Sequence, residues 1–166
     1  CWTRSRKEDF EARMRILGDM EVICATTMAA GSDFLSRFRF HGVLLDEVAQ
    51  ATEVSSIVPV VLRGARQLVL VGDHCQLPPS VVSREAELRG LSLSVYSRLA
   101  DAGVEPHFLD TQYRSHPRLA EFSARRFYDG GLRSGVPGSA RPPPKGVPWP
   151  NPLVPVAFLE TWGREV

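Results

Sequence analysis

Two short apolar runs, each ending in an acidic residue, constrain the fold of this chain more than any other feature. The first is Gly42–Asp46 (GVLLD) and the second is Gln67–Asp73 (QLVLVGD). Neither run alternates apolar and polar residues, which is typical of strands in a sheet whose two faces are covered by helices. The segment 49–62 between them predicts a crossover helix, with Pro59 expected to bend it or to mark a turn. This order of elements predicts a parallel α/β sheet.

Helical apolar spacing and further short apolar runs predict three more helices and three more strands. The helices are expected over 5–20, 92–102 and 116–128, and the strands over 21–26, 107–109 and 156–160. The third of these helices has a predicted apolar side formed by Leu119, Phe122, Phe127 and Tyr128. Eight of the 13 prolines fall within 135–155, so this stretch is predicted to be a linker or a long surface loop.

The composition excludes some classes of protein. The formal net charge is only +1, so a nucleic acid would have to bind through a local basic patch. No apolar run approaches the roughly 20 residues that span a bilayer, so no membrane association is expected. The chain begins with Cys1, from which we expect it to be a piece of something larger. The three cysteines have no CxxC spacing, which indicates an intracellular setting, cytoplasmic or nuclear.

The first candidate site is the pair Asp46-Glu47, which follows the first apolar run. A rigid strand fixes such a carboxylate at the carboxyl edge of the sheet, where ligands bind in open α/β folds. The aspartate can hold Mg²⁺, usually through water, and the glutamate can orient and deprotonate an attacking water. The alternative interpretation is a solvated strand end with a helix N-cap.

The second candidate site follows the second run, where Gly72-Asp73 precedes Gln76 in a loop that Pro78 and Pro79 make rigid. A glutamine side chain both donates and accepts hydrogen bonds, so Gln76 can report the presence of a γ-phosphate or of its attacking water. The alternative is an ordinary exit from a strand into a loop. The adjacent His74 and Cys75 have poor geometry for binding one metal ion, and no zinc site is expected.

The third candidate site is the hexapeptide Gln112–Pro117 (QYRSHP). The guanidinium of Arg114 offers a fixed fork of donors that suits phosphate, and Tyr113 offers a ring for stacking. Alone, this segment is also compatible with a solvated charge at the start of a helix.

Taken together, these segments resemble the nonsense-mediated-decay-type helicases of superfamily 1. The similar segments are Val22–Thr27 (VICATT), Asp46–Glu53 (DEVAQATE, a Walker B box), Gly72–Pro79 (GDHCQLPP), Gly90–Ser94 (GLSLS) and Gln112–Pro117 (QYRSHP). The resemblance extends from about residue 20 to about residue 135. Senataxin-like and immunoglobulin-mu-binding helicases share these motifs, so the subfamily stays open.

The resemblance implies a pair of RecA-like P-loop NTPase domains with ATP between them. Residues 1–110 would be the later part of the first domain, a parallel sheet flanked by helices, and 111–166 the beginning of the second, with its Pro-rich loop over 135–155. The implied catalytic residues are Asp46 (Mg²⁺ through water), Glu47, Gln76 and Arg114, the last as an arginine finger. Nucleotide binding is implied for Gln50, Asp73, Gln112 and Tyr113, and contact with the nucleic-acid backbone for Thr26 and Thr27. Family members move 5′ to 3′ on single-stranded RNA or DNA through backbone contacts.

The sequence departs from the family in two respects. No Gly-x-x-x-x-Gly-Lys-[Ser/Thr] phosphate-binding loop occurs in it, and the family's later arginine motif is also missing. Both absences are compatible with truncation, and the chain alone is expected neither to bind ATP well nor to hydrolyse it.

Two alternatives to an ATP-dependent helicase remain open. One is a catalytically incompetent scaffold that binds nucleic acid or protein, and the other is a RecA-fold ATPase that remodels complexes without unwinding.

Overall fold

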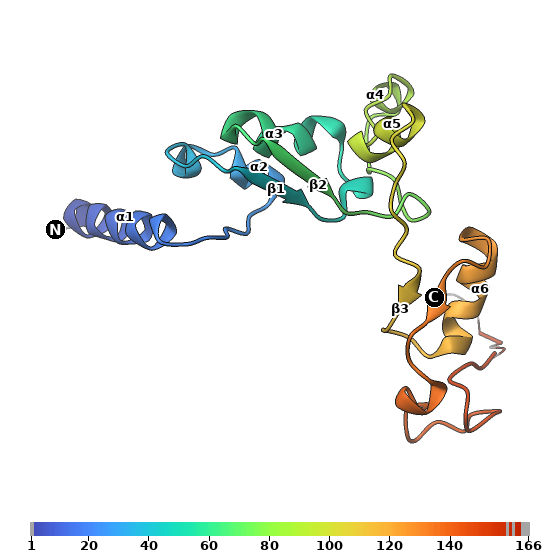
Figure 1. The fold of residues 1–166 in the computed structure, drawn as a ribbon. Coiled ribbons are helices and arrows are strands. Elements are labelled where there is room, and N and C mark those ends of the chain that lie inside the picture. Colours follow the sequence, from blue (N-terminus) through green and yellow to red (C-terminus); the bar gives the residue numbers. More distant parts are fainter. Residues whose placement is uncertain (1, 159, 161, 164–166) are drawn as a thin grey trace. The chain divides into compact units, whose positions relative to one another are not determined.

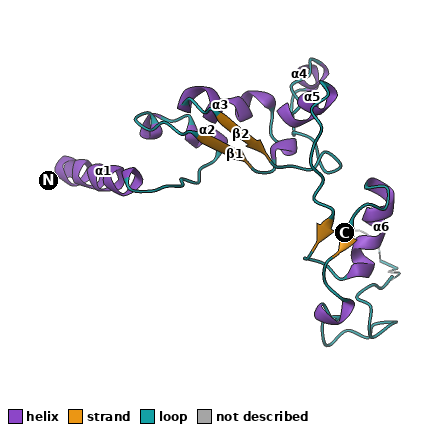
Figure 2. Ribbon diagram, in the orientation of Figure 1, coloured by secondary structure: helices purple, strands orange, loops and turns teal. Residues whose placement is uncertain are grey.

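The structure, a computed structural model, describes residues 2–158, 160, 162 and 163. It is a mixed α/β fold with two small parallel sheets, in two compact units, Cys1–Val104 and Glu105–Val166 (Figure 1, Figure 2). The first unit contains α1 (Trp2–Gly18), α2 (Thr27–Ala30), β1 (Gly42–Leu45), α3 (Glu53–Arg63), β2 (Gln67–Leu70), α4 (Arg84–Leu88) and α5 (Val95–Asp101). The second unit contains β3 (Thr111–Gln112), α6 (Pro117–Phe127) and β4 (Arg133–Ser134). Short 3₁₀ turns occur at Asp33–Leu35, Val48–Gln50 and Gly138–Ala140.

The predicted strand–helix–strand unit is confirmed in the first unit. β1 and β2 pair in parallel, with Gly42 opposite Gln67 and Leu45 opposite Leu70. The connecting helix α3 starts later than predicted, because the chain first makes the 3₁₀ turn Val48–Gln50. Pro59 lies inside α3 and marks no turn.

The core of the first unit lies beside the ends of the two strands. Leu45, Val48 and Val95 are buried together, so this core joins β1, the 3₁₀ turn that follows it and α5. A hydrogen bond also joins α5 to α3, because Arg98 Nε donates to Glu53 Oε1 at 2.7 Å. This hydrogen bond and the carboxylate charge raise the pKa of Arg98 above its ordinary value. The first turn of α3 is therefore fixed to α5.

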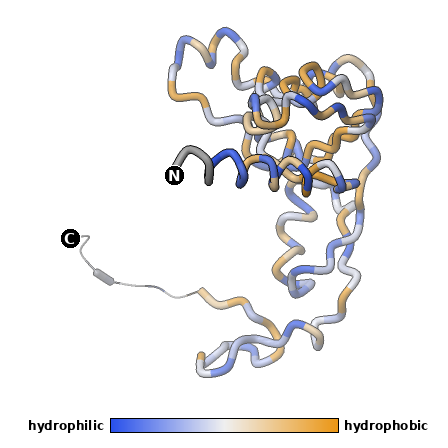
Figure 3. Tube along the Cα trace, turned by 90° about the vertical axis from the view of Figure 1, so that its left-hand side faces the viewer, coloured by the Kyte–Doolittle hydropathy of each residue, from blue (hydrophilic) through white to orange (hydrophobic). Residues whose placement is uncertain are grey.

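The helix predicted over 5–20 is confirmed as α1, Trp2–Gly18, although its apolar and polar residues are less clearly separated onto two sides than those of α3 and α6. Figure 3 shows hydrophilic and hydrophobic residues alternating along it. Phe10 on its apolar side makes an edge-to-face contact with Phe34, with ring centroids 5.8 Å apart. Among the described residues, no helix is long and apolar enough to cross a membrane.

Three predicted strands are wrong where the structure describes them. Residues 21–26, 107–109, 156–158 and 160 belong to no strand, and Leu159 lies outside the described residues. An apolar run becomes a strand only when another strand offers its backbone a hydrogen-bonding ladder. Beyond β1–β2, the described residues form only the short β3–β4 pair.

The expectation that helices cover both faces of the strands is also wrong for this chain. Leu44 is 63% exposed and Val69 is 52% exposed, although both belong to the paired strands. The predicted apolar side of α6 is open too, with Phe122 65% exposed. Much of the apolar surface that the sequence patterns predicted to be buried is therefore accessible in the described part of the chain.

The second unit is a parallel pair of two-residue strands connected through α6. Pro117 occupies the first turn of α6, where its missing N–H costs nothing. His116, 5% exposed, caps this helix by accepting a 3.1 Å hydrogen bond at Nδ1 from the backbone N–H of Arg118. The Pro-rich segment 135–155 contains the 3₁₀ turn Gly138–Ala140 and no other helix or strand.

Candidate functional site

The two carboxylates that follow β1 are held in a tight turn. The backbone N–H of Glu47 donates a 3.0 Å hydrogen bond to Asp46 Oδ1. Glu47 itself has φ 53° and ψ 33°, a left-handed conformation that a residue with a side chain rarely adopts. Gln50 Nε2 then donates a 2.9 Å hydrogen bond to Glu47 Oε2. Both carboxylates are exposed, and their orientation is set by this turn.

The loops that follow β1 and β2 are joined backbone to backbone. Val71 N–H donates to Leu45 O at 2.8 Å, and Val48 N–H donates to Val71 O at 3.0 Å. Gly72 lies next, where a Cβ atom would come within 2.9 Å of the backbone nitrogen of Ala49 and within 3.2 Å of that of Val48. Only glycine allows this approach without a shift of the backbone. The carboxylate turn and the Gly72-Asp73 loop therefore lie against each other.

Asp73 orients Gln76 across this second loop. Its Oδ1 accepts a 3.0 Å hydrogen bond from Cys75 N–H, and its Oδ2 accepts a 2.8 Å hydrogen bond from Gln76 Nε2. The backbone repeats the link, since Gln76 N–H donates to Asp73 O at 3.2 Å. His74 stacks on Tyr96 of α5, with ring centroids 5.9 Å apart. The loop is thus anchored on the helix that also forms the core.

In the second unit, Gln112 closes the loop that carries Tyr113 and Arg114. Its Nε2 donates to Ser115 O at 2.9 Å and to Ser134 Oγ at 2.8 Å, while its Oε1 accepts from Ser115 N–H at 2.8 Å. The Gln112 amide is therefore occupied by the loop itself and by β4. Gln112 would therefore influence a ligand indirectly, by fixing the conformation of the loop.

Tyr113 and Arg114 are the exposed residues of that loop. The Tyr113 side chain is 62% exposed, and one side of its ring lies against the backbone of Gly135. The guanidinium of Arg114 makes no hydrogen bond or ion pair with any residue that the structure describes. An aromatic ring and a fork of donors are thus both presented to solvent.

Family models match almost the whole chain. One described as an AAA domain covers residues 1–84, and a second, also described as an AAA domain, covers residues 91–166. The chain belongs to the superfamily 1 helicases of the regulator-of-nonsense-transcripts type. Among its curated relatives, "Regulator of nonsense transcripts 1 homolog" of Drosophila melanogaster is 46% identical over 93% of this chain. The Arabidopsis thaliana protein of that name is 45% identical over 87% of it, and "ATP-dependent helicase upf1" of Schizosaccharomyces pombe is 42% identical over 93%. The chain spans 13%, 12% and 17% of the length of these relatives, respectively.

The site residues expected for this helicase family fall into two groups, one in each unit. Asp46, Glu47, Gln50, Asp73 and Gln76 are brought together in the first unit, after adjacent strands. Gln112, Tyr113 and Arg114 share one loop of the second unit.

Thr26 and Thr27 lie at the start of the four-residue helix α2. Thr26 Oγ1 accepts a 3.2 Å hydrogen bond from Ala29 N–H and so caps this helix. Capping accounts for a threonine at this position without any ligand. Nucleic-acid contact by Thr26 and Thr27 remains a prediction.

Three residues were missed by the sequence analysis. Gly72 was noted only as part of a motif, although its contact with Ala49 explains why a glycine precedes Asp73. Gly135 and Arg141 were read only as part of a Pro-rich loop, yet both contact the segment Tyr113–Arg114. The approach of Gly135 and Arg141 to a loop more than 20 residues earlier has no local sequence signal.

Asp73, His74 and Cys75 are the one group of three or more potential His, Cys, Asp or Glu metal ligands among the described residues, with ligand atoms all within 4.8 Å of one another. Both oxygens of Asp73 already accept hydrogen bonds, and the His74 ring stacks on Tyr96. These contacts hold the loop of Gln76 in shape, and they account for the closeness of the three side chains without a metal ion.

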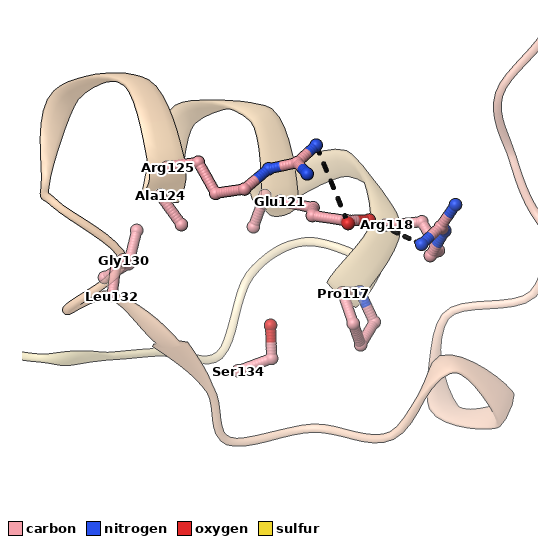
Figure 4. Close-up of a pocket in the computed structure, with 9 residues that line it drawn as sticks. Pro117, Arg118, Glu121, Ala124, Arg125, Gly130, Leu132 and Ser134 are labelled. Atoms are coloured by element: carbon pink, nitrogen blue, oxygen red, sulfur yellow. Dashed lines mark ion pairs between the residues drawn. The ribbon is translucent and has the colours of Figure 1, made fainter.

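A cavity of about 340 Å³ runs along α6 in the second unit (Figure 4). Arg118, Glu121 and Arg125 line it from the helix and are joined by ion pairs of 2.6 and 3.7 Å. Ser134 also lines it and accepts the hydrogen bond from Gln112. None of the predicted site residues lines this cavity, so it is separate from the candidate site.

Proposed function

We propose that this chain supplies the hydrolysis and sensing residues of an ATP-dependent nucleic-acid helicase. In this proposal, the protein couples ATP hydrolysis to 5′-to-3′ movement on single-stranded RNA or DNA and to unwinding. The observation that carries it is the junction between Asp46-Glu47 and Asp73-Gln76. Adjacent parallel strands end beside each other, and Gly72 brings the second loop onto the backbone of the first. Such an edge of an open α/β sheet is where ligands bind.

Asp46 fits the role of holding Mg²⁺ through water. One of its oxygens is fixed by the N–H of Glu47, and the side chain is exposed, so its other oxygen can accept from a water in the ion's coordination shell. The bound ion would supply charge neutralisation for the phosphates of ATP.

Glu47 is the proposed base that orients and deprotonates the attacking water. Its left-handed backbone turns the carboxylate out of the line of β1, and Gln50 holds one carboxylate oxygen at 2.9 Å. Strained backbone of this kind costs of order 1–3 kcal/mol and is concentrated at functional sites. Gln76, held by Asp73, is the proposed sensor of the γ-phosphate and its water.

The second unit would contribute Tyr113 and Arg114. Tyr113 has the exposed ring that stacking on adenine requires, and Arg114 has a guanidinium that the described residues leave unpaired. An arginine finger stabilises the charge of a phosphoryl-transfer transition state and is worth about 10³–10⁵ in rate.

We further propose that the two units belong to two RecA-like domains, residues 1–110 to the first and 111–166 to the second. The AAA-domain matches to 1–84 and 91–166 support two such domains. The cradle for the β- and γ-phosphates would come from a phosphate-binding loop that is not in this sequence.

The test uses the full-length protein that contains this chain. We expect single-strand-stimulated ATP hydrolysis and strand displacement, both abolished by Glu47→Gln with nucleotide binding retained. Glu87→Gln, which changes an exposed carboxylate of α4, is the matched control and should leave both activities intact. Hydrolysis without strand displacement would favour a remodelling ATPase, and a wild-type protein that hydrolyses no ATP would favour a scaffold.

A further inference from the structure

Arg141, in the Pro-rich segment, holds the backbone of the loop that carries Tyr113 and Arg114. Its Nε donates a 2.9 Å hydrogen bond to Arg114 O, and its Nη2 donates a 2.9 Å hydrogen bond to Tyr113 O. The third nitrogen, Nη1, donates to Ala140 O, also at 2.9 Å, which fixes the guanidinium to its own segment. One planar group thus joins two consecutive carbonyls of the loop.

Two glycines bring the segment of Arg141 close to this loop. The backbone of Gly135 lies so near the Tyr113 ring that a Cβ atom would fall 2.2 Å from a ring carbon. A Cβ atom on Gly138 would likewise fall 2.6 Å from Nε2 of His116, the buried cap of α6. The N–H of Gly135 donates to Gln112 O at 2.8 Å. Residues 135–141 therefore form a strap across the loop, which we call the 135–141 strap.

The strap fixes the direction in which the Arg114 side chain leaves the backbone. The carbonyls of Tyr113 and Arg114 belong to the two peptide units on either side of the Arg114 Cα, so a rigid fork bound to both restricts rotation about the backbone bonds of Arg114. The Arg114 side chain is exposed and has no partner among the described residues, so its direction depends on its backbone.

We propose that Arg141 is a positioning residue that aims Arg114, and with it Tyr113, at the nucleotide. This inference rests on the proposed function, because it assigns Arg141 a role that acts through Arg114. Arg141 itself binds no nucleotide in this role, since its donors are directed at backbone carbonyls.

Lysine cannot replace Arg141 in this role. A lysine has one nitrogen at the end of a flexible stem, whereas Arg141 uses separate nitrogens of one rigid plane for the two carbonyls. Charge and stem length alone are therefore insufficient. Because the hydrogen bonds are exposed to solvent, their loss should loosen the loop without unfolding the protein.

The experiment measures kcat for single-strand-stimulated ATP hydrolysis in the full-length protein, under steady-state conditions with saturating ATP. The variants are Arg141→Ala, Arg141→Lys, Arg114→Ala and the double variant Arg114→Ala/Arg141→Ala. Arg125→Ala, which changes an exposed arginine of α6 whose ion pair among the described residues is with Glu121, is the matched control. Far-ultraviolet circular dichroism and thermal melting report whether each variant folds.

We expect Arg141→Ala and Arg141→Lys to lower kcat about tenfold to hundredfold, the usual cost of misplacing a catalytic group. Arg125→Ala should match the wild type, and the double variant should be no slower than Arg114→Ala because Arg141 acts through Arg114. Wild-type kcat for both Arg141 variants, full rescue by lysine, or a multiplicative loss in the double variant overturns the inference and leaves the proposed function standing. Wild-type kcat in Arg114→Ala overturns both. Should Arg141→Ala fail to fold, Arg141→Lys decides the question alone.

Discussion

Gly72 lies against the backbone of Ala49, so close that a Cβ atom on Gly72 would be 2.9 Å from the Ala49 nitrogen. The two residues belong to loops that follow different strands, and the contact lets the loops share backbone hydrogen bonds. It also places the carboxylate turn next to the loop of Gln76. The junction depends on the absence of a side chain at a single position.

Gly72→Ala should therefore destabilise the first unit and separate the two loops. Overpacking of a tight contact costs about 1–3 kcal/mol, and here the neighbouring atoms are backbone that cannot rotate away. The free energy of unfolding from urea denaturation measures the effect. Gly42→Ala in β1 is the control, because a Cβ atom there meets nothing within 4 Å. Equal stability of the two variants would show that the backbone around Gly72 can shift to accommodate a Cβ atom at little cost in free energy.

Asp73→Asn should lower the rate of ATP hydrolysis by the full-length protein. The carboxylate uses one oxygen for Cys75 N–H and the other for Gln76 Nε2, whereas an asparagine has a single acceptor oxygen. Gln76 would lose its fixed orientation, and kcat should fall by about tenfold or more. Steady-state kinetics with Asp101→Asn, an exposed residue at the end of α5, provide the control. An unchanged kcat would mean that Gln76 needs no support from Asp73.

Gly135→Ala should weaken nucleotide binding through Tyr113. The new Cβ atom would overlap the Tyr113 ring, and the ring, as the end of a side chain, would move away from its present position. Loss of one aromatic contact is worth about 0.5–1.5 kcal/mol, so KM for ATP should rise about twofold to tenfold. Gly163→Ala is the control, since a Cβ atom there has no neighbour within 4 Å. A KM equal to that of the control would argue against adenine stacking by Tyr113.

The strands and their carboxylates could be predicted because the signals are local. An apolar run that ends in Asp46-Glu47 predicts both a strand and two carboxylates at its end. The structure has β1 at this run and a tight turn at the two carboxylates. The run 21–26 is also a short apolar run but forms no strand, because strand formation depends on a pairing partner elsewhere in the chain.

The supporting contacts of the site could not be predicted from local pattern. Arg141 reaches Arg114 from 27 residues away, within a stretch whose prolines indicate only an irregular backbone. The left-handed conformation of Glu47 also has no signal, since glutamate is not a residue that favours it. Composition and periodicity report what a residue prefers, whereas these features depend on what its neighbours impose.

The chain of 166 residues by itself should release no phosphate from ATP. Asp46, Glu47 and Gln76 can orient water and a metal ion only around phosphates that are already held, and no phosphate-binding loop occurs in this sequence. Backbone N–H groups of such a loop provide the cradle for the β- and γ-phosphates, and three exposed side chains cannot replace them. Phosphate release by the purified chain, with and without single-stranded RNA, should equal that of its Glu47→Gln variant. Phosphate release above the level of the Glu47→Gln variant would show that this chain binds and hydrolyses ATP without a phosphate-binding loop.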